Sequence, residues 1–326
     1  MERYSRQEIL KEIGKKRQGM LEKASVAIIG IGAIGSVTAS LLARAGIGKI
    51  VLIDRDIVEE HNVQRQMLFT EEDRVKPKAA QAMAYLQKVN KTIHIEADTR
   101  ELNAETIHTL KNYDLMLDCT DNMETRFLIN DFCTKYRKQW IHASAIATKA
   151  RCVVITPETP CFRCIFKPAK PGSLETCDTT GVLNTITTAI ASIQCTEAIK
   201  VLTEQQYIKE LLLYDIWKQD LTTIRTKKKK DCLCCAKKEF TFLAAKASSE
   251  ATKLCGQGRV QVRGSTPNIT ALLKRLEKCG RVKQTKYGLV FEANETNFFL
   301  FTDGRCLIKA RTTEEAKSLY SKYIGY

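Results

Sequence analysis

The sequence predicts an α/β protein with a Rossmann-like, mostly parallel sheet, helices on both faces and a small C-terminal α+β domain. Three glycines, Gly30, Gly32 and Gly35, stand between an apolar run typical of a buried strand and an apolar helical stretch. Strand-like and helix-like segments then alternate along the chain, which is typical of a parallel sheet. A stretch rich in Ala, Ser and Lys at residues 243–258 indicates a linker before a second unit.

The chain has 326 residues, which is enough for a full α/β core and a smaller second unit. We expect a first domain at residues 1–242, a linker at 243–258 and a second domain at 259–326. The elements expected in the first domain are a helical segment at 5–23, a strand from 25, a helix at 34–45, a strand at 49–54, a helix at 77–89, a strand at 93–97, a helix at 104–110, a strand at 115–118, a helix at 123–136, strands at 140–143 and 151–156, a helix at 181–203, and strands at 211–217 and 221–225. Those expected in the second are strand segments at 260–262, 282–291 and 298–308, with helices at 268–279 and 313–323.

The glycine-rich turn predicts a nucleotide site. Its glycines allow a tight turn and a close approach of the backbone to a phosphate, and the helix at 34–45 offers unpaired N–H groups and a partial positive charge at its N-terminus. Asp54 ends the second strand, where a carboxylate can accept hydrogen bonds from ribose hydroxyls. The motif leaves the kind of nucleotide open, because an NAD-dependent oxidoreductase would begin in the same way.

Charged residues further along the chain indicate that the bound nucleotide is a reacting triphosphate. Arg65 offers a fork of donors that can clamp a triphosphate, and Lys78, at the start of a helix, adds a second cation. Lys76 is the alternative to Lys78. Asp121 follows a strand, at the sheet edge where the functional residues of parallel sheets usually lie. It could also be the N-cap of the helix at 123–136.

Two C-x-x-C pairs predict a metal site. Cys161 and Cys164 form the first pair, and Cys232 and Cys235 form the second. Each pair can bring two sulfurs to a shared centre, which fits tetrahedral zinc, with Cys234 as a competing ligand and a redox or free-thiol role as the alternative. Four thiolates leave no open coordination position, so we expect the metal to be structural.

With these residues the chain resembles the MoeB/ThiF/HesA family of adenylyltransferases, the prokaryotic relatives of ubiquitin-activating enzymes. The resemblance covers about residues 4–238. The matching residues are Tyr4-Ser-Arg-Gln7, the glycine loop, Asp54, Asn62-x-x-Arg65-Gln66, Lys78, Asp118-Cys-Thr-Asp-Asn122 and the two Cys pairs. One departure is Val75, which stands where the family commonly has a glycine.

The resemblance implies an activity, cofactors and partners. The implied reaction is attack by the C-terminal Gly-Gly carboxylate of a ubiquitin-like (β-grasp) sulfur-carrier protein on the α-phosphate of ATP, which releases pyrophosphate. Magnesium would accompany ATP, zinc would occupy the Cys pairs, and two subunits would form a homodimer. The residues implied in nucleotide binding are Gly30, Gly32, Gly35, Asp54, Asn62, Arg65, Gln66, Lys78, Asp121 and Asn122.

The resemblance also implies catalytic roles. Arg65 and Lys78 would act on the phosphates, and Asp121 would be the magnesium and phosphate residue, because a hard cation favours a carboxylate oxygen. Arg6 would reach the nucleotide site of the partner subunit. Cys177 would lie in a surface loop and accept the acyl group or take sulfur from a donor, although some family members do not need this cysteine.

Composition and missing motifs narrow the function classes. No G-x-S-x-G or H-E-x-x-H motif occurs, which argues against a hydrolase. An NAD-dependent oxidoreductase and a non-catalytic carrier-binding scaffold stay open as alternatives. No signal peptide and no long apolar run are present, so a cytoplasmic protein without membrane contact is expected. The net charge is +15, but the basic run at residues 227–230 favours a solvated turn over a nucleic-acid patch.

Overall fold

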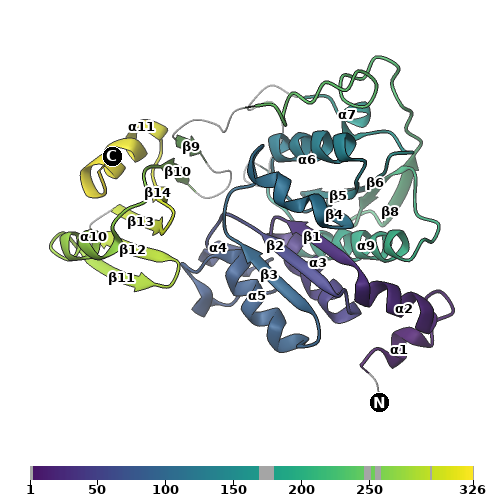
Figure 1. The fold of residues 1–326 in the computed structure, drawn as a ribbon, viewed down its shortest axis with the longest axis horizontal. Coiled ribbons are helices and arrows are strands. Elements are labelled where there is room, and N and C mark those ends of the chain that lie inside the picture. Colours follow the sequence, from purple (N-terminus) through teal and green to yellow (C-terminus); the bar gives the residue numbers. More distant parts are fainter. Residues whose placement is uncertain (1–2, 169–179, 246–250, 254–257, 294–295, 326) are drawn as a thin grey trace. The chain divides into compact units, whose positions relative to one another are not determined.

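The computed structural model divides the chain into two compact units, Met1–Ala245 and Lys246–Tyr326 (Figure 1). It describes residues 3–168, 180–245, 251–253, 258–293 and 296–325. The first unit holds a mixed, mostly parallel sheet with helices on both faces, and the second holds an antiparallel sheet with helices. The predicted fold class is therefore confirmed. Within the described residues, no helix is both long and apolar enough to cross a membrane.

The sheet of the first unit has eight strands in the order β3-β2-β1-β4-β5-β6-β7-β8. The strands are β1 (Ser25–Ile29), β2 (Lys49–Ile53), β3 (His94–Asp98), β4 (Leu115–Asp118), β5 (Gln139–Ile146), β6 (Lys149–Ile155), β7 (Leu211–Asp215) and β8 (Asp220–Ile224). Strands β1 to β5 pair in parallel, and β6 to β8 are added antiparallel. The chain order reverses at β1, so the carboxyl ends of β1 and β4 flank the position where such sheets bind ligands.

Helices cover both faces of this sheet. One face is covered by α3 (Ala33–Ala45), α5 (Lys78–Val89) and α9 (Asn184–Leu202), and the other by α6 (Met123–Tyr136), α7 (Phe162–Ile165) and the 3₁₀ helix η2 (Thr106–Asn112). Along β1, Val26 and Ile28 enter the first core, whereas Ala27 and Ile29 enter the second. Burial on both faces explains why the central strands are continuous apolar runs.

Local signals set the ends of the helices that border the site. Helix α3 has Gly32 as its N-cap and ends at Gly46, whose φ of 87° is the left-handed conformation that glycine adopts without strain. Helix α6 begins at Asn122, whose side chain accepts a hydrogen bond from the Thr125 N–H at 2.9 Å. The N-cap of α6 is therefore Asn122, and the alternative that Asp121 caps this helix is wrong.

The N-terminal segment differs from the prediction. Instead of one helical stretch at residues 5–23, it forms α1 (Ser5–Glu8) and α2 (Gly14–Lys23), because the chain turns between them and Gly14 has a φ of 63°. Ile9 and Leu10 are 72% and 51% exposed, whereas Ile13 and Leu21 are buried. These apolar residues consequently do not share one side of a helix.

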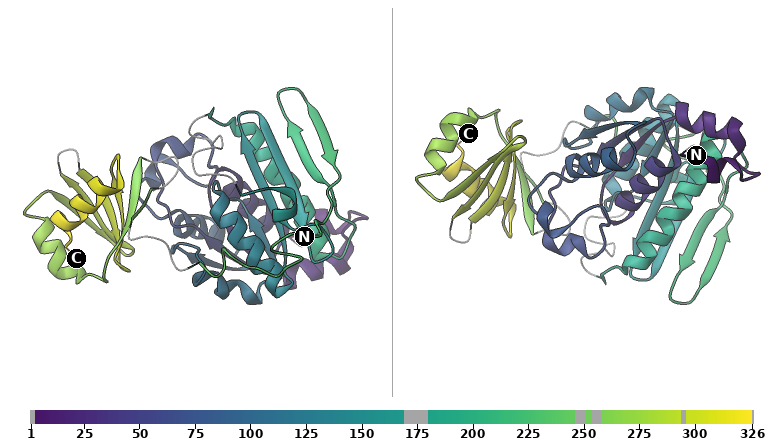
Figure 2. Two further views of the ribbon diagram at one scale, coloured as in Figure 1. Left: turned by 90° about the horizontal axis from the view of Figure 1, so that it is seen from above. Right: turned by 90° about the horizontal axis from the view of Figure 1, so that it is seen from below.

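The second unit contains a six-stranded sheet in the order β11-β12-β13-β14-β10-β9. Its strands are β9 (Ala251–Lys253), β10 (Arg259–Arg263), β11 (Arg281–Thr285), β12 (Gly288–Ala293), β13 (Thr296–Phe301) and β14 (Arg305–Lys309). Helices α10 (Ile269–Leu276) and α11 (Thr313–Tyr323) pack on one face of this sheet (Figure 2). Each predicted strand segment at 282–291 and 298–308 is thus a hairpin.

Two further differences concern secondary structure. The predicted linker at 243–258 contains β9, which pairs antiparallel with β10. The helix predicted at 104–110 is the 3₁₀ helix η2, shifted toward the C-terminus. Short elements are difficult to predict from sequence because their stability comes from tertiary contacts rather than from a periodic apolar pattern.

Candidate active site

The turn between β1 and α3 has the geometry of a phosphate-binding loop. Gly30 has a φ of 85°, and a Cβ there would lie 3.0 Å from the Cys119 carbonyl oxygen. A Cβ at Gly35 would lie 1.9 Å from the Gly30 carbonyl oxygen, so glycine is required for close packing of helix against strand. A Cβ at Gly32 would meet its nearest atom only at 3.9 Å, on the Gln66 side chain. The space beside Gly32 is thus open toward the Gln66 side chain.

Asp54 orders this loop from the end of β2. Its Oδ2 accepts a hydrogen bond from the Ile31 N–H at 2.7 Å, and its Oδ1 accepts one from the Asp56 N–H at 2.8 Å. Burial raises the pKa of Asp54, an effect that the Lys78 ammonium partly opposes. Each carboxylate oxygen can accept a further hydrogen bond, so a role toward ribose is compatible with this geometry.

Lys78, rather than Lys76, lies among the acidic residues of the site. The Lys78 side chain is buried, with Nζ 3.5 Å from Asp56 Oδ2. Burial opposes its charge, but the surrounding carboxylates, led by Asp56 and including Asp121, raise the pKa of Lys78. Lys76 instead pairs with Asp73 at 3.0 Å, and its side chain is 46% exposed. Lys78 is therefore the cation that can face a bound phosphate.

Arg55 is a second cation at the site, and sequence analysis did not single it out. It directly follows Asp54, and its guanidinium pairs with Glu101. Burial opposes the charge of Arg55, but nearby carboxylates, among them Glu101 and Asp121, raise its pKa. Its position directly after Asp54, at the carboxyl end of a parallel strand, was the available signal.

Asn62 and Arg65 belong to the short helix α4 (Glu60–Val63) and the turn after it. The Asn62 side chain accepts a hydrogen bond from the Glu59 N–H at 3.1 Å and completes a capping box. The Arg65 guanidinium donates to the His61 carbonyl oxygen at 2.8 Å. Asn62 therefore shapes the segment, and Arg65 sits at its end.

Gln66 carries a buried polar atom that fits a ligand. Its side chain is buried beside Gly32, and among the described residues its Oε1 finds no hydrogen-bond donor. A buried acceptor without a donor costs about 1–3 kcal/mol, which a ligand donor would recover. A ribose hydroxyl or an adenine amino group can supply that donor, so the residues present fit a nucleotide.

Val75 adopts a left-handed backbone conformation, which favours glycine. Its φ is 65°, and its N–H donates to the Val58 carbonyl oxygen at 2.9 Å. A β-branched residue in this region is strained by about 1–3 kcal/mol, and glycine would not be. The turn that leads to Lys78 is consequently formed at a cost in stability.

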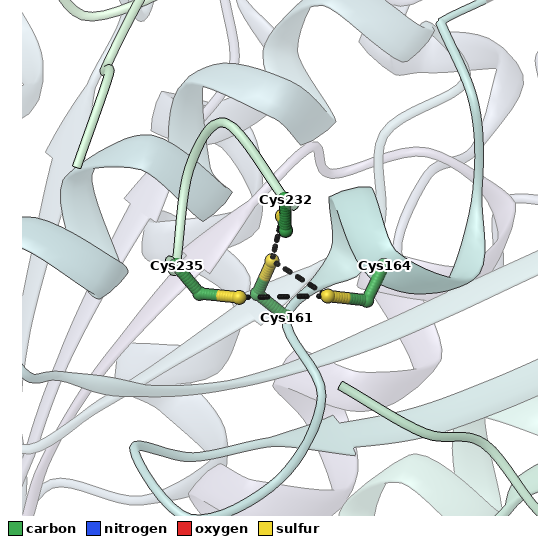
Figure 3. Close-up of side chains that lie close together, drawn as sticks. All are labelled: Cys161, Cys164, Cys232 and Cys235. Carbon is green, nitrogen blue, oxygen red and sulfur yellow. Dashed lines mark hydrogen bonds between the residues drawn. The ribbon is translucent and has the colours of Figure 1, made fainter. Parts of the chain in front are cut away.

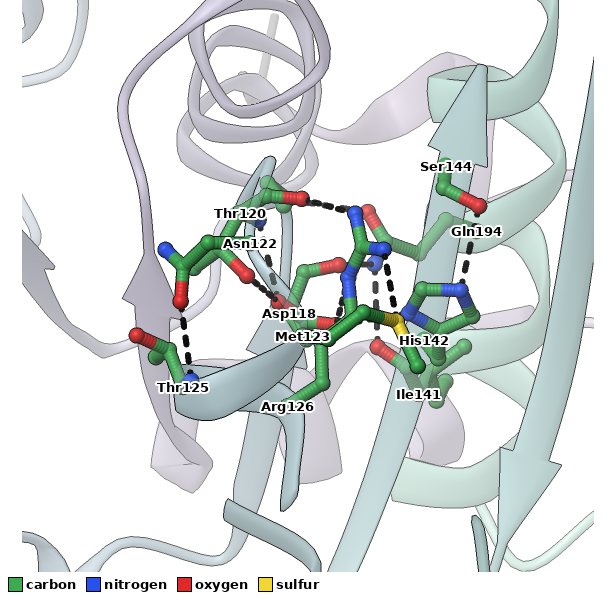
Figure 4. Close-up of polar contacts among 11 residues, drawn as sticks. Asp118, Thr120, Asn122, Met123, Thr125, Arg126, Ile141, His142, Ser144 and Gln194 are labelled. Carbon is green, nitrogen blue, oxygen red and sulfur yellow. Dashed lines mark hydrogen bonds and ion pairs between the residues drawn. The ribbon is translucent and has the colours of Figure 1, made fainter. Parts of the chain in front are cut away.

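A buried polar network holds the loop after β4 (Figure 4). Asp118 Oδ1 accepts hydrogen bonds from the Thr120 N–H at 3.0 Å and from its hydroxyl at 2.6 Å. Asp118 Oδ2 lies 2.6 Å from His142 Nδ1, and His142 Nε2 lies 3.1 Å from Ser144 Oγ. Arg126 donates to the Thr120 carbonyl oxygen at 2.5 Å. This network fixes the loop that carries the predicted magnesium residue.

The Asp118–His142 pair is an ionised carboxylate beside a neutral imidazole. Burial opposes the charge of Asp118, but the hydrogen bond from His142 and the nearby positive charges lower its pKa. Burial also lowers the pKa of His142 and outweighs the opposing effect of Asp118. With Asp118 ionised, Nδ1 of the imidazole is the donor and Nε2 accepts from the Ser144 hydroxyl.

We expect His142 to make folding sensitive to mild acid. Because its pKa is lowered in the folded state, the unfolded chain takes up a proton first, and the free energy of unfolding falls as pH drops below about 6.5. The contribution of Asp118, whose pKa is also lowered, is lost only below about pH 4. Urea unfolding between pH 7.5 and 5.5 should show that the free energy of unfolding depends less steeply on pH in His142→Gln than in wild type.

Four cysteines lie close together in the first unit (Figure 3). The sulfur atoms of Cys161, Cys164, Cys232 and Cys235 all lie within 4.8 Å of one another. Three of the pairs are 3.8, 3.6 and 3.5 Å apart. Tetrahedral zinc with bonds of about 2.3 Å requires sulfur atoms about 3.8 Å apart, so the geometry fits this metal.

The ionisation of the four thiols also fits a cation bound between them. Burial raises the pKa of Cys164 to about 11, and at Cys232 hydrogen bonds from Cys235 and other cysteines outweigh burial and lower the pKa to about 7. Four thiols this close cannot all ionise unless a cation balances their charge.

Asn130 of α6 joins the two cysteine segments. Its side-chain oxygen accepts the Phe162 N–H at 2.7 Å, and its amide nitrogen donates to Cys234 Sγ at 3.2 Å. Cys234 is thus occupied by Asn130 and lies outside the group of four. The competing assignment of Cys234 as a ligand is not supported by this geometry.

Two other predicted site residues, Arg6 and Cys177, remain to be placed. Arg6 is exposed in the N-terminal segment. Cys177 lies outside the described residues. The site itself brings together the glycine loop, Asp54, Lys78 and the loop of Asp121, with Arg55 as the added cation.

A glycine loop at the reversal point of a parallel sheet, beside buried cations and carboxylates, defines a nucleotide-binding α/β protein with a separate four-cysteine centre. Residues 4–235 match the ThiF family. The chain belongs to this family, which confirms the predicted resemblance.

Similar proteins agree with this assignment. The chain is 35% identical over 334 residues to the "Sulfur carrier protein ThiS adenylyltransferase" of Bacillus subtilis, with 99% of each chain covered. It is 32% identical over 239 residues to the "SAMP-activating enzyme E1" of Haloferax volcanii, covering 72% of this chain and 88% of that protein. A crystal structure of E. coli MccB with ATP matches with a TM-score of 0.64 and 23% identity, over 72% of this chain and 74% of that one, which establishes likeness of fold.

Proposed function

We propose that the protein catalyses ATP-dependent adenylylation of the C-terminal Gly-Gly carboxylate of a ubiquitin-like sulfur-carrier protein. The observation that carries the proposal is the site at the ends of β1, β2 and β4, where Lys78 and Arg55 lie near Asp121 and beside a phosphate-binding loop. A relative that matches the whole chain is a ThiS adenylyltransferase, which supports a carrier protein of that kind as the substrate.

In the proposed reaction, a carboxylate oxygen of the carrier attacks the α-phosphorus of ATP. A new O–P bond forms, the bond to the β-phosphate oxygen breaks, and pyrophosphate leaves with that electron pair. No general base is required, because the carboxylate is already ionised at neutral pH. Both reactants are anions, so Lys78, Arg55 and Arg65 would offset the repulsion and stabilise the charge on the phosphate oxygens.

Two metals accompany this proposal. Magnesium bound to the triphosphate would neutralise charge there, and Asp121, exposed at the edge of the site, offers it a carboxylate oxygen. Zinc would hold the four-cysteine centre and tie α7 to the segment at residues 232–235. With four thiolate ligands, that zinc would be structural.

The structure also bears on the alternative of a non-catalytic scaffold. That alternative rested on Val75, which replaces a glycine on the approach to Lys78. Val75 keeps the left-handed conformation, and Lys78 lies among the carboxylates of the site. This geometry favours an active enzyme.

The proposed function predicts ATP–pyrophosphate exchange that depends on a Gly-Gly-ended carrier. Exchange of labelled pyrophosphate into ATP should appear with the carrier and be absent with a carrier truncated by its last two residues, because that carboxylate is the nucleophile. Cys177→Ser should retain exchange, since its thiol would act only on the adenylate. Carrier-independent exchange, or fluorescence-detected binding of NAD in place of ATP, would contradict the proposal.

We also propose a symmetric homodimer in which Arg6 completes the partner's site. Ile9 and Leu10, largely exposed in one chain, would be covered by such a partner. Mixing an Arg6→Ala chain with an Asp121→Ala chain should restore about a quarter of wild-type exchange, because half of the dimers regain one intact site. A monomer in light scattering at working concentration, or no restored exchange, would count against the dimer.

A further inference from the structure

A basic cavity of about 550 Å³ lies in the first unit at the C-terminal end of α6. Two cysteines of the four-cysteine centre, Cys161 and Cys235, form part of its wall. Among the described residues, no carboxylate lines it. The cations that line it are Lys135, Arg137, Lys138, Lys228, Lys229 and Lys238.

Half of these cations are engaged elsewhere in the protein. Lys138 donates to the Tyr113 carbonyl oxygen at 3.1 Å, and Lys228 donates to the Pro157 carbonyl oxygen at 2.8 Å. Lys135 lies over the ring of Tyr136 and complements the negative end of the helix dipole of α6.

The other three cations have no such partner. The side chains of Arg137, Lys229 and Lys238 make no hydrogen bond or ion pair with any described residue, and all three are exposed. Three like charges around one concavity repel one another, and an anion bound between them would relieve that repulsion. These three exposed cations are therefore available to bind an anion.

The cavity is separate from the nucleotide site. Helix α6 has 14 residues and its N-cap, Asn122, belongs to the loop of Asp121. The cavity lies at the other end of that helix, about 20 Å away along its axis. One ligand cannot contact both places, and the proposed adenylylation does not use the cations of the cavity.

We propose that this cavity binds a small molecule carrying a diphosphate or triphosphate group. Its volume lies within the range of about 300–1,000 Å³ that is typical of small-molecule sites, whereas an extended nucleic acid would follow an open basic surface. Arg137 can bind phosphate oxygens with two parallel hydrogen bonds. Ile155, Pro157 and Phe240 add an apolar side that suits the ring of a nucleotide.

The basic run at residues 227–230 provides its own control. Lys228 and Lys229 line the cavity, whereas Lys227 and Lys230 belong to the same run but do not. If the site is specific, a bound anion should protect Lys229 from chemical modification more than it protects Lys227 and Lys230. If the run is only a solvated basic turn, all of these lysines should be protected equally.

The test is a lysine footprint of the full zinc-loaded chain. Limited acetylation, mapped by mass spectrometry, is compared with and without inorganic tripolyphosphate. We expect acetylation of Lys229 and Lys238 to slow by about fivefold or more, and that of Lys227 and Lys230 to change by less than about twofold. Equal protection of all these lysines, or protection near the glycine loop alone, would overturn the proposal.

Paired variants separate a site from general charge. Arg137→Gln with Lys229→Gln should abolish protection of Lys238, whereas Lys227→Gln with Lys230→Gln, which removes the same charge, should preserve it. Zinc content, measured in both, checks that the cysteine centre is intact. Loss of protection in both pairs would refute a defined site.

Two further probes identify the ligand class. Protection by ADP at a lower concentration than tripolyphosphate would assign a nucleotide, and the reverse would assign an inorganic polyphosphate. An RNA oligonucleotide that protects Lys227 and Lys230 as strongly as Lys229 would show an extended nucleic-acid surface and overturn the small-molecule site.

Discussion

Replacing Cys161 with serine is expected to remove the bound zinc and to lower the thermal midpoint by about 10 °C or more, because structural zinc contributes several kcal/mol and 1 kcal/mol shifts a domain of this size by about 2–4 °C. Cys161 lies in contact with both Cys164 and Cys232, at 3.8 and 3.6 Å between sulfur atoms. Losing it would release α7 from the segment at residues 232–235. The measurements are zinc content of the purified protein and its thermal unfolding curve.

Cys234 offers a matched control. It lies in the same segment as Cys232 and Cys235, but it receives a hydrogen bond from Asn130 and is outside the group of four. Cys234→Ser should therefore keep its zinc and lose less stability. Protein purified without chelator that contains no zinc, or a Cys161→Ser variant with full zinc, would rule out this metal centre.

The parts of the fold that were predicted correctly are those fixed by short-range chemistry. The turn from β1 into α3 could be predicted because Gly30 and Gly35 are required by a left-handed φ and by a contact that leaves no space for a Cβ. The cluster of four cysteines could be predicted because two C-x-x-C turns have few other uses. In each case, residue type and spacing determine the geometry.

The parts that were missed depend on contacts between distant segments. His142 is a buried histidine in an apolar strand, and nothing in its neighbourhood in the sequence shows that parallel pairing places it opposite Asp118. Arg55 is brought near Glu101 and Asp121, which lie in two other loops, by the fold of the sheet.

The break in the N-terminal segment was missed for a different reason. The pattern of charged and apolar residues at 5–23 is compatible with helix throughout. The structure interrupts it at residues 9–13 and buries Ile13 while leaving Ile9 exposed. Periodicity describes which residues could share a face, but it does not show where a glycine such as Gly14 turns the chain.

Cys177 and the domain boundaries stay as predictions. Cys177 lies outside the described residues, and its role would be tested by a sulfur-transfer assay of Cys177→Ser. The division into Met1–Ala245 and Lys246–Tyr326 is close to the expected one. Leu243, the first residue of the expected linker, packs in the second core of the first unit.

Asp121→Ala is expected to lower ATP–pyrophosphate exchange by about 100-fold or more, which corresponds to about 3 kcal/mol of lost transition-state stabilisation. Asp121 lies near the Lys78 ammonium and the Arg55 guanidinium, where its carboxylate raises the pKa of both. It precedes the N-cap of α6 and is exposed, so its removal should leave the fold and zinc content unchanged.

The exchange assay becomes decisive when Asp121→Ala is compared with Glu124→Ala. Glu124 is another exposed acid, in the first turn of α6, and it has the same charge. If the role of Asp121 is to hold magnesium, Glu124→Ala should retain nearly full exchange, and Asp121→Asn should require more magnesium for half-maximal rate because an amide oxygen binds a hard cation more weakly than a carboxylate. Equal losses in the two alanine variants would mean that general negative charge matters at this edge, and full exchange in Asp121→Ala would remove it from the catalytic site.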